Sequence, residues 1–311
     1  MKLLITGALG HIGSRLIHDL RPGEFSEVAL VDNLATQRYC SLFNLPAGIP
    51  FRFVEADVCT ANLDKLFAGM DAVIHLAAIT DATKSFENEA QVEQVNFVGT
   101  ERVARACAKA GCRMIFPSST SVYGVQEGVV DEDCPIDQLK PQSPYADSKL
   151  KAERLLAELG ATANLRFIIC RCGTIYGVSP GMRFHTAVNK FAWQACRGEP
   201  VSVWRTALHQ RRPYLDLGDA VRAFRFILQR DVFDRRIYNV LTDNLTVTEV
   251  LEALRELVPD LTVKFVDSAI MNQLSYTVRN DRFRALGFEF RGRLGAALNE
   301  TVGLLKGVRS R

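Results

Sequence analysis

Long apolar runs are missing from this 311-residue chain, and so is an excess of charge of one sign. No window approaches the roughly 18 consecutive apolar residues of a membrane-spanning helix, and the first apolar residues run into Gly7 before a secretory signal could form. The 38 basic and 35 acidic side chains leave a formal charge of +3, too small for a typical nucleic-acid binder. We therefore expect a cytoplasmic protein that binds neither a membrane nor a nucleic acid.

Paired cysteines are missing as well. The eight cysteines show no Cys-x-x-Cys spacing and the five histidines are scattered, so the sequence predicts reduced thiols and no metal site. What is present is an ordinary globular composition, with 48% hydrophobic and 23% charged residues. At roughly 150 residues per domain, the length allows two domains or one large one.

Short apolar runs alternate with stretches of helical periodicity through the first 170 residues. Near-continuous apolar runs are typical of parallel strands covered on both faces, and their alternation with helices indicates a doubly wound sheet. The predicted fold class is therefore α/β, with a Rossmann-type parallel sheet. The expected strands lie at residues 2–6, 28–31, 51–54, 72–76, 114–116 and 165–169, and the two longest helices at 89–110 and 145–159.

The alternation weakens after about residue 171, where a smaller α/β substrate lobe is expected to begin. We assign residues 1–170 to a dinucleotide-binding domain and residues 171–311 to the smaller lobe, with the chain rejoining the first domain at about 213–235. Thr246 and Glu249 have the spacing of a capping box that begins a helix. A cleft between the two lobes is the expected ligand site.

Three glycines separate the first expected strand from the first helix. Gly7, Gly10 and Gly13 stand where a dinucleotide pyrophosphate rests against helix N–H groups. Asp32 follows about 20 residues later, at the end of the second strand, where a carboxylate can accept both ribose hydroxyls and would repel a 2′-phosphate. The sequence thus favours NAD over NADP, although Arg38 offers a charge partner to a phosphate.

Tyr145 and Lys149 lie four residues apart at the start of a predicted helix, so both project from one face. A nearby ammonium favours the phenolate and lowers the pKa of a tyrosine, which lets the pair move protons near neutral pH. Ser119 follows the fifth strand, at the sheet edge where doubly wound folds bind ligands, and its hydroxyl can donate to a substrate oxygen. These three residues are the predicted catalytic residues.

Further motifs accompany these elements along nearly the whole chain, at residues 31–34, 56–58, 75–78, 96–100, 119–124, 171–177 and 212–219. Together they resemble the extended short-chain dehydrogenase/reductase family, in its NAD-dependent nucleotide-sugar epimerase/dehydratase branch. The resemblance implies Tyr145 as the acid/base, Lys149 as its electrostatic partner and a nicotinamide-ribose ligand, and Ser119 as the second hydroxyl. Homodimers of this family usually form through the two long helices, and we expect one here.

The resemblance also implies which residues bind cofactor and substrate. The implied NAD-binding residues are Gly7, Gly10, His11, Ile12, Gly13, Asp32, Asn33, Asp57, Val58, Leu76, Ala77, Ala78, Asn96, Tyr145 and Lys149. The implied nucleotide-sugar-binding residues are Thr80, Ser121, Thr174, Arg183, Asn189, Arg212 and Arg279.

The residues that follow Ser119 bear on the reaction. Family members that eliminate or decarboxylate usually carry an acidic residue before Val-Tyr-Gly, whereas this chain has Thr120 and Ser121. Without a carboxylate there, no second acid/base is evident for removing a C5 proton, which disfavours dehydration and decarboxylation.

What remains is an NAD-dependent 4-epimerase that oxidises C4 of a UDP-hexose or UDP-hexuronate and returns the hydride to the other face. The alternatives are an NAD(P)-dependent nucleotide-sugar reductase or dehydrogenase, then a dehydratase, and remotely a non-catalytic NAD-binding regulator.

Overall fold

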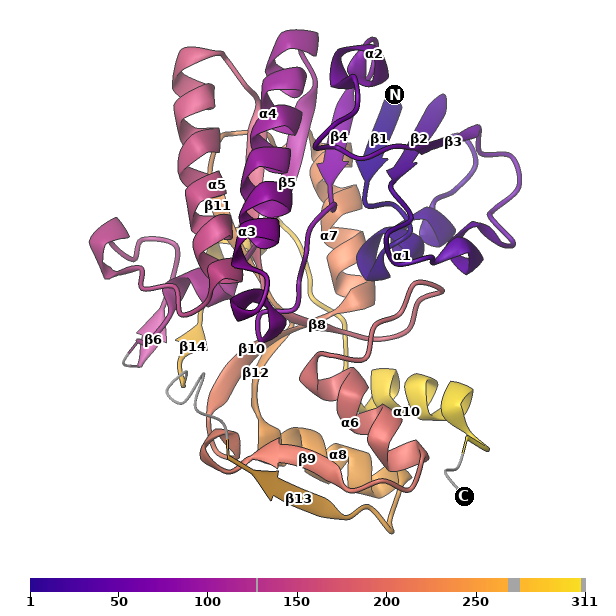
Figure 1. Cartoon of the computed structure of the whole chain (residues 1–311), viewed down its shortest axis with the longest axis vertical. Helices are drawn as coiled ribbons and strands as arrows, with labels where there is room; N and C mark the ends of the chain where they lie inside the picture. The colour runs from indigo at the N-terminus through magenta and orange to yellow at the C-terminus, as the bar shows by residue number, and fades with distance from the viewer. Residues whose placement is uncertain (127, 268–274, 309–311) are drawn as a thin grey trace.

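The computed structural model describes residues 1–126, 128–267 and 275–308. Its centre is a seven-stranded, wholly parallel sheet with the order β11-β7-β5-β4-β1-β2-β3, shown in Figure 1. The order reverses direction between β1 and β4, as a doubly wound fold requires. The predicted α/β fold with a Rossmann-type sheet is confirmed. The strands are β1 (Lys2–Thr6), β2 (Glu27–Asp32), β3 (Phe51–Glu55), β4 (Ala72–His75), β5 (Arg113–Ser119), β7 (Phe167–Cys172) and β11 (Ile237–Val240).

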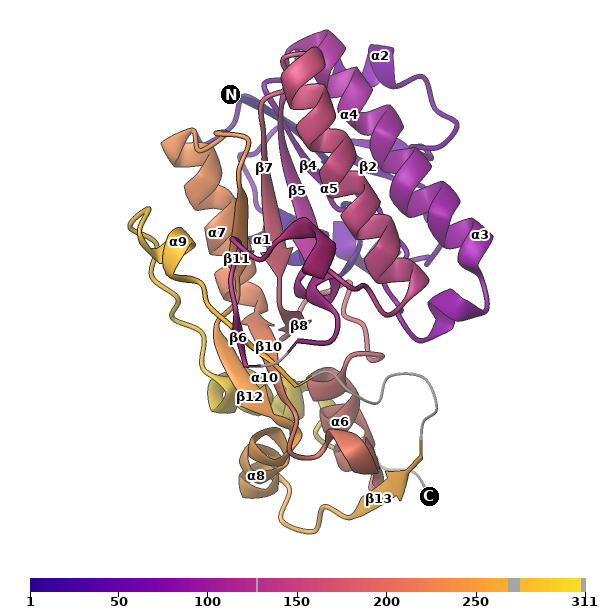
Figure 2. The ribbon, with the colours of Figure 1, turned by 90° about the vertical axis from the view of Figure 1, so that its left-hand side faces the viewer.

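Alternate residues of each strand face opposite layers of helices, which explains the unbroken apolar runs. In β1, Leu3 and Ile5 join one buried cluster and Leu4 joins another, and all three are fully buried. The first cluster lies under α1 (His11–Asp19) and α7 (Leu217–Arg230), and the second under α2 (Leu63–Phe67), α4 (Gly99–Ala110) and α5 (Pro144–Thr162). Figure 2 shows these layers on the two sides of the sheet.

The long helix predicted at residues 89–110 is built from three segments. α3 (Glu89–Val92) continues through a π-helical segment (Glu93–Val98) into α4. Such π turns are rare and often lie at functional sites, and this one carries Asn96. The other long helix, α5, begins after Ser143, whose hydroxyl caps the backbone N–H of Ala146.

After β7 the chain leaves the large sheet and builds a smaller lobe around a third buried cluster. α7 and β11 then bring it back, because α7 packs on α1 and β11 pairs with β7. The predicted capping box of Thr246 and Glu249 is present at the start of α8. The smaller lobe contains β8 (Thr174–Tyr176), α6 (Ala187–Cys196), β9 (Val201–Trp204), β10 (Arg211–Asp216), β12 (Asp243–Thr246), α8 (Val247–Leu257), β13 (Val263–Val266) and α10 (Leu294–Leu305). β6 (Val129–Val130) pairs with β14 (Thr277–Val278), and α9 (Asp281–Arg284) packs beside β11 of the large lobe.

Three further observations concern the whole described chain. All eight cysteines are free thiols. Within the described ranges, no three His, Cys, Asp or Glu side chains gather as metal ligands would. In the same ranges, no helix combines the length and the apolar character needed to cross a bilayer.

Candidate active site

Two glycines of the turn after β1 are packed too tightly to carry a side chain. Gly7 has a φ of +66°, and a Cβ there would lie 2.6 Å from the backbone N of Ala77. A Cβ on Gly13 would lie 2.5 Å from the carbonyl oxygen of Ala8. α1 starts directly afterwards, and no side chain caps its first N–H groups. These groups can therefore receive an anion such as a pyrophosphate.

Asp32 lies at the end of β2, beside this turn. Its carboxylate accepts the backbone N–H of Leu9 at 3.0 Å and that of Leu34 at 2.9 Å, one on each oxygen. Each oxygen keeps further lone pairs, so the group can still accept ribose hydroxyls. Arg38 is half-buried and is attracted by the charge of Asp32.

Two other predicted cofactor residues, Asn33 and Asp57, contact each other at the ends of β2 and β3. The amide of Asn33 donates to Asp57 at 3.0 Å, and the backbone N–H of Cys59 donates to the other oxygen at 2.7 Å. Burial alone would raise the pKa of Asp57, but these hydrogen bonds outweigh it and lower the pKa. Val58, which follows, is buried.

His11, the first residue of α1, is a buried neutral imidazole. Burial, with the nearby Arg183 charge, lowers its pKa to about 3. Its Nε2 lies 3.0 Å from the carbonyl oxygen of Gly177 and therefore donates to it. The side chain thus connects the glycine turn to the loop that follows β8. Ile12, next on α1, packs against the buried cluster under α1 and α7.

Asn96 orders the loop after β4. Its Oδ1 accepts the N–H of Ile79 at 2.8 Å, and its Nδ2 donates to the carbonyl of Ile79 at 2.9 Å and to the Ser148 hydroxyl at 3.3 Å. Upstream, Leu76 and Ala77 donate backbone N–H groups to Thr6. Residues 76–78, predicted to line the cofactor, are therefore fixed between β1 and the π-helical segment.

Ser119 and Tyr145 come together where β5 ends and α5 begins. Ser119 lies close enough to the Tyr145 phenol to act on it as a hydrogen-bonding group, and its hydroxyl accepts the Ser121 hydroxyl at 2.8 Å. Burial raises the pKa of Tyr145, while the charge of Arg183 and the Ser119 hydrogen bond act to lower it. The structure thus brings two other predicted residues, Ser119 and Ser121, near the phenol of Tyr145.

Lys149 lies one turn further along α5 and is buried. Its ammonium donates to the carbonyl of Pro117 at 2.9 Å and stands 4.6 Å from the centroid of the Phe116 ring. Burial lowers its pKa to about 8, although the nearby Cys172 and Glu153 act in the opposite direction. Within the described chain it makes no ion pair, so it is a buried cation held by a backbone dipole and an aromatic face.

Arg183 lies in the loop after β8, close enough to the predicted catalytic Tyr145 for its charge to act on the phenol. It donates to the Thr80 hydroxyl, and its charge acts on Tyr145. Asn189, which the resemblance implies as a nucleotide-sugar-binding residue, is buried. Its Oδ1 accepts the N–H of Gly177 at 3.1 Å, and its Nδ2 donates to the carbonyl of Arg183 at 3.0 Å. Asn189 therefore shapes the loop that carries Arg183.

The remaining predicted substrate residues are spread out. Thr174 is half-buried on β8, paired in register with Tyr214. Arg212, on β10, donates to Gln210 at 3.0 Å. Arg279 has a largely exposed side chain and forms an ion pair with Asp281 at 2.6 Å. Thr80 contacts Arg183, whose charge acts on Tyr145, and no contact among the described residues brings Arg279 to them.

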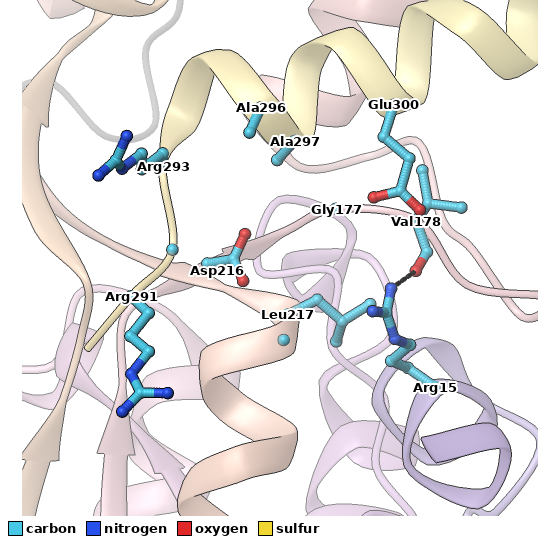
Figure 3. A pocket seen from close by; sticks show the side chains of 12 residues that line it. Arg15, Gly177, Val178, Asp216, Leu217, Arg291, Arg293, Ala296, Ala297 and Glu300 are labelled. Carbon is cyan, nitrogen blue, oxygen red and sulfur yellow. Dashed lines mark hydrogen bonds between the residues drawn. The ribbon is translucent and has the colours of Figure 1, made fainter. Parts of the chain in front are cut away.

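A cavity of about 250 Å³ lies nearby, between α1, the start of α7 and α10 (Figure 3). Arg15 lines it and donates to the carbonyl of Val178 at 3.1 Å, drawn as a dashed line. Asp216 and Glu300 are its acidic lining residues. The cavity shares Gly177 with the site described above, but neither Tyr145 nor any other predicted catalytic residue lines it.

Two residues behind Lys149 were missed in the sequence. Glu153 and Arg171 form a buried ion pair that also contacts Ser118. Two signals were available, because Glu153 follows Lys149 at helical spacing and Arg171 opens one of the motifs quoted above.

Comparison with known proteins places this geometry in a family. The sequence model of the NAD dependent epimerase/dehydratase family matches residues 3–240. The chain belongs to this family, and the resemblance predicted from the motifs is confirmed.

Individual relatives catalyse different reactions. A trifunctional UDP-glucose 4,6-dehydratase, 3,5-epimerase and reductase of Arabidopsis thaliana is 30% identical over 320 residues, which cover 97% of this chain and 46% of the plant protein. The chain thus spans about half the length of that relative. Two solved structures cover nearly all of both chains. MoeE5 in complex with UDP-glucuronic acid and NAD has 30% identity and a TM-score of 0.84, with 97% and 98% covered. UDP-glucose 4-epimerase of Thermus thermophilus with NAD has 27% identity and a TM-score of 0.85, with 99% of each covered.

Proposed function

We propose that this protein is an NAD-dependent nucleotide-sugar 4-epimerase that acts on a UDP-hexose or UDP-hexuronate. The observation that carries the proposal is the convergence of Ser119, Tyr145 and Lys149 at the carboxyl edge of the sheet, next to a glycine turn closed by Asp32. The 4-epimerase of Thermus thermophilus, with a similar fold, supports it.

The residues present fit NAD. Gly7 and Gly13 leave no room for side chains beside the uncapped start of α1, and Asp32 offers carboxylate oxygens where a ribose would lie. When bound, NAD supplies a hydride acceptor for C4 of the sugar and a hydride donor for the return.

The chain itself moves the proton. Tyr145 takes the proton of the 4-hydroxyl, and Ser119 donates a hydrogen bond to the same oxygen as it becomes a ketone. Arg183 supplies positive charge that favours the phenolate form of Tyr145. We assign the same role to the Lys149 ammonium, one helical turn further along α5. Rotation of the 4-keto sugar presents its other face, and Tyr145 then returns the proton. The cycle consumes no net oxidant.

The two positions after Ser119 support epimerisation over dehydration. The Thr120 hydroxyl is buried and donates to the carbonyl of Cys172 at 3.3 Å. The Ser121 hydroxyl donates to Ser119. Neither group is a carboxylate, and neither is placed to remove a C5 proton as a base.

Arg183 favours a hexuronate over a hexose. Its guanidinium is next to Tyr145, and within the described residues its Nε is a buried donor without a hydrogen-bond partner. A carboxylate on the sugar would supply the missing acceptor and would add to the negative charge that Asp81 already provides. MoeE5, which has solved structures with UDP-glucuronic acid and with UDP-glucose, supports a UDP-hexuronate or a UDP-hexose as the substrate class.

The first experiment incubates the purified protein with NAD and a panel of UDP-, GDP-, CDP- and TDP-sugars. Sugar stereochemistry is followed by NMR and NADH by absorbance. Inversion at C4 without accumulation of NADH is the expected result. A net change in NADH or NADPH would instead establish the reductase or dehydrogenase, and loss of water from the sugar would establish a dehydratase.

We also propose a cytoplasmic homodimer formed through α4 and α5. The outer faces of these helices carry the ion pairs Glu101–Arg105 and Asp147–Lys151. Sedimentation of the purified protein tests the dimer.

A further inference from the structure

Behind the predicted catalytic residues, a buried ion pair contacts the end of β5. This strand carries Ser119 and binds Lys149 through the carbonyl of Pro117. Arg171 donates two nitrogens to the Glu153 carboxylate, the shortest contact being 2.7 Å, and each side chain is only 3% exposed. The Ser118 hydroxyl donates to the same carboxylate at 2.5 Å. Ser118 therefore lies between Pro117, whose carbonyl binds Lys149, and Ser119, a predicted catalytic residue.

The pair is tied into three further elements. Arg171 stands 4.8 Å from the centroid of the Tyr123 ring, in the turn after Ser119. The Tyr123 hydroxyl donates to Asn239 of β11 at 2.9 Å. In register, Arg171 on β7 lies opposite Ser118 on β5. The network therefore links α5 to the neighbouring strands β5, β7 and β11, next to the predicted catalytic residues.

Glu153 also follows Lys149 by one helical turn, on the same face of α5. Lys149 has no ion-pair partner of its own within the described residues, so its ammonium depends on more distant negative charge to remain protonated. The titratable groups that act on or are affected by Lys149 are Glu153 on α5, Cys172 on β7 and His75 on β4.

We propose that Glu153 is a positioning residue that keeps Lys149 protonated and fixes the strand end carrying Ser119, and that Arg171 holds Glu153 ionised for this purpose. The catalytic role of Lys149 rests on the proposed function, but the test of this proposal does not depend on that function. Burial acts to lower the pKa of Lys149 and Glu153 acts to raise it, which agrees with this assignment.

Removing each charge of the pair separately gives a test that a purely structural role would not pass. Glu153→Gln leaves the Arg171 cation uncompensated near Lys149 and should lower the Lys149 titration midpoint by about one pH unit or more. Arg171→Met leaves the Glu153 anion uncompensated and should raise it. Removing both charges in the double variant should bring the midpoint back toward the wild-type value.

The midpoint is measured by NMR on protein carrying ¹³C-labelled lysine, without substrate, with the Lys149 signal assigned by its loss in Lys149→Met. Asp231→Asn is the matched control, because it breaks a surface pair with Arg113 and Arg166. It should leave the midpoint unchanged. Equal midpoints in wild type and a folded Glu153→Gln protein would overturn the proposal, as would shifts of the same sign in both single variants.

If Glu153→Gln does not fold, Arg171→Met decides by the direction of its shift, and Glu153→Asp, which keeps the charge, should retain the wild-type midpoint. The pH dependence of sugar conversion is the second readout, and its alkaline limb should move with the midpoint. If the proposed function is wrong, the wild-type protein converts no sugar, yet the variants still shift the Lys149 midpoint. If this inference is wrong, the sugar is converted but the variants leave the midpoint unchanged.

Discussion

Polar groups are held differently on the cofactor side and on the substrate side of the site. On the cofactor side, Asp32 receives two backbone N–H groups and Asn96 makes three hydrogen bonds. On the substrate side, the Nε atoms of Arg183 and Arg212 are buried and, among the described residues, have no partner. His11 is the exception on the cofactor side, since its Nδ1 is also unpartnered there.

This difference indicates where binding energy is available. A buried donor without an acceptor costs about 1–3 kcal/mol, so an anionic ligand on the substrate side would recover free energy that the protein alone does not. The cofactor side is preorganised by its own backbone, and we expect it to bind without rearrangement. Variants on each side should therefore fail in different assays.

The largest effect should come from Tyr145→Phe, which removes the proton-carrying oxygen. Turnover should fall by about 10²- to 10⁴-fold, while NAD affinity, measured by calorimetry, should stay within about twofold. Tyr238→Phe is the control, because that hydroxyl contacts Asp234, away from the site, and its loss should not affect turnover. Near-normal turnover of Tyr145→Phe would remove Tyr145 from the mechanism.

Arg183→Gln tests the substrate side. Conversion of a UDP-hexuronate should fall by about 10- to 100-fold relative to a UDP-hexose, because the charge-assisted contact to the carboxylate is lost. The variant also removes a cation that favours the phenolate, so the pKa of Tyr145 should rise and the acidic limb of the pH–rate profile should move to higher pH. Equal losses for both sugars would assign Arg183 to the diphosphate instead.

The same contrast explains what the sequence could predict. Gly7, Asp32 and the Tyr145–Lys149 spacing act through local geometry, since a turn, a strand end and one helical turn place them. Asn189 is different. Its amide binds the backbone of Gly177 and of Arg183, and these contacts could not be predicted from sequence because they form only in the folded loop.

The ion pair behind Lys149 was hidden for a related reason. Glu153 and Arg171 come from a helix and a strand, and the sequence does not show that both point into one buried layer. Nothing in the sequence distinguishes their partner Ser118 from the other hydroxyl residues at 118–121. The π-helical segment that places Asn96 likewise leaves no sign in the apolar periodicity.

Asp32→Ala tests the cofactor side. The variant loses the ribose acceptor and also the carboxylate that orders Leu9 and Leu34, so NAD affinity should fall by about tenfold or more. Affinity for NADP should fall less or rise, because the charge that repels a 2′-phosphate is gone and Arg38 remains. Calorimetry with both cofactors measures this. Unchanged NAD affinity would contradict the ribose assignment.

The smallest effect concerns stability. The buried charge of Lys149, which the proposed mechanism needs, should lower the free energy of unfolding. Its folded-state pKa of about 8 lies below its ordinary value of 10.5, so the unfolded chain binds more protons between these two pH values. The free energy of unfolding should therefore rise with pH across that window, and the cost of the buried charge is fully present below about pH 8. Lys149→Met should accordingly stabilise the cofactor-free protein by about 1 kcal/mol at about pH 7, with a gain that shrinks toward about pH 10.

Urea denaturation at about pH 7 and about pH 9.5 measures this difference. Lys151→Met is the control, because Lys151 is exposed and its pKa is raised by Asp147 and Glu93. Its loss should change stability by less than about 0.5 kcal/mol, in the destabilising direction. A Lys149→Met protein less stable than wild type near neutral pH would mean that the Pro117 and Phe116 contacts outweigh the desolvation of the ammonium, and that the catalytic lysine is preorganised at no cost to the fold.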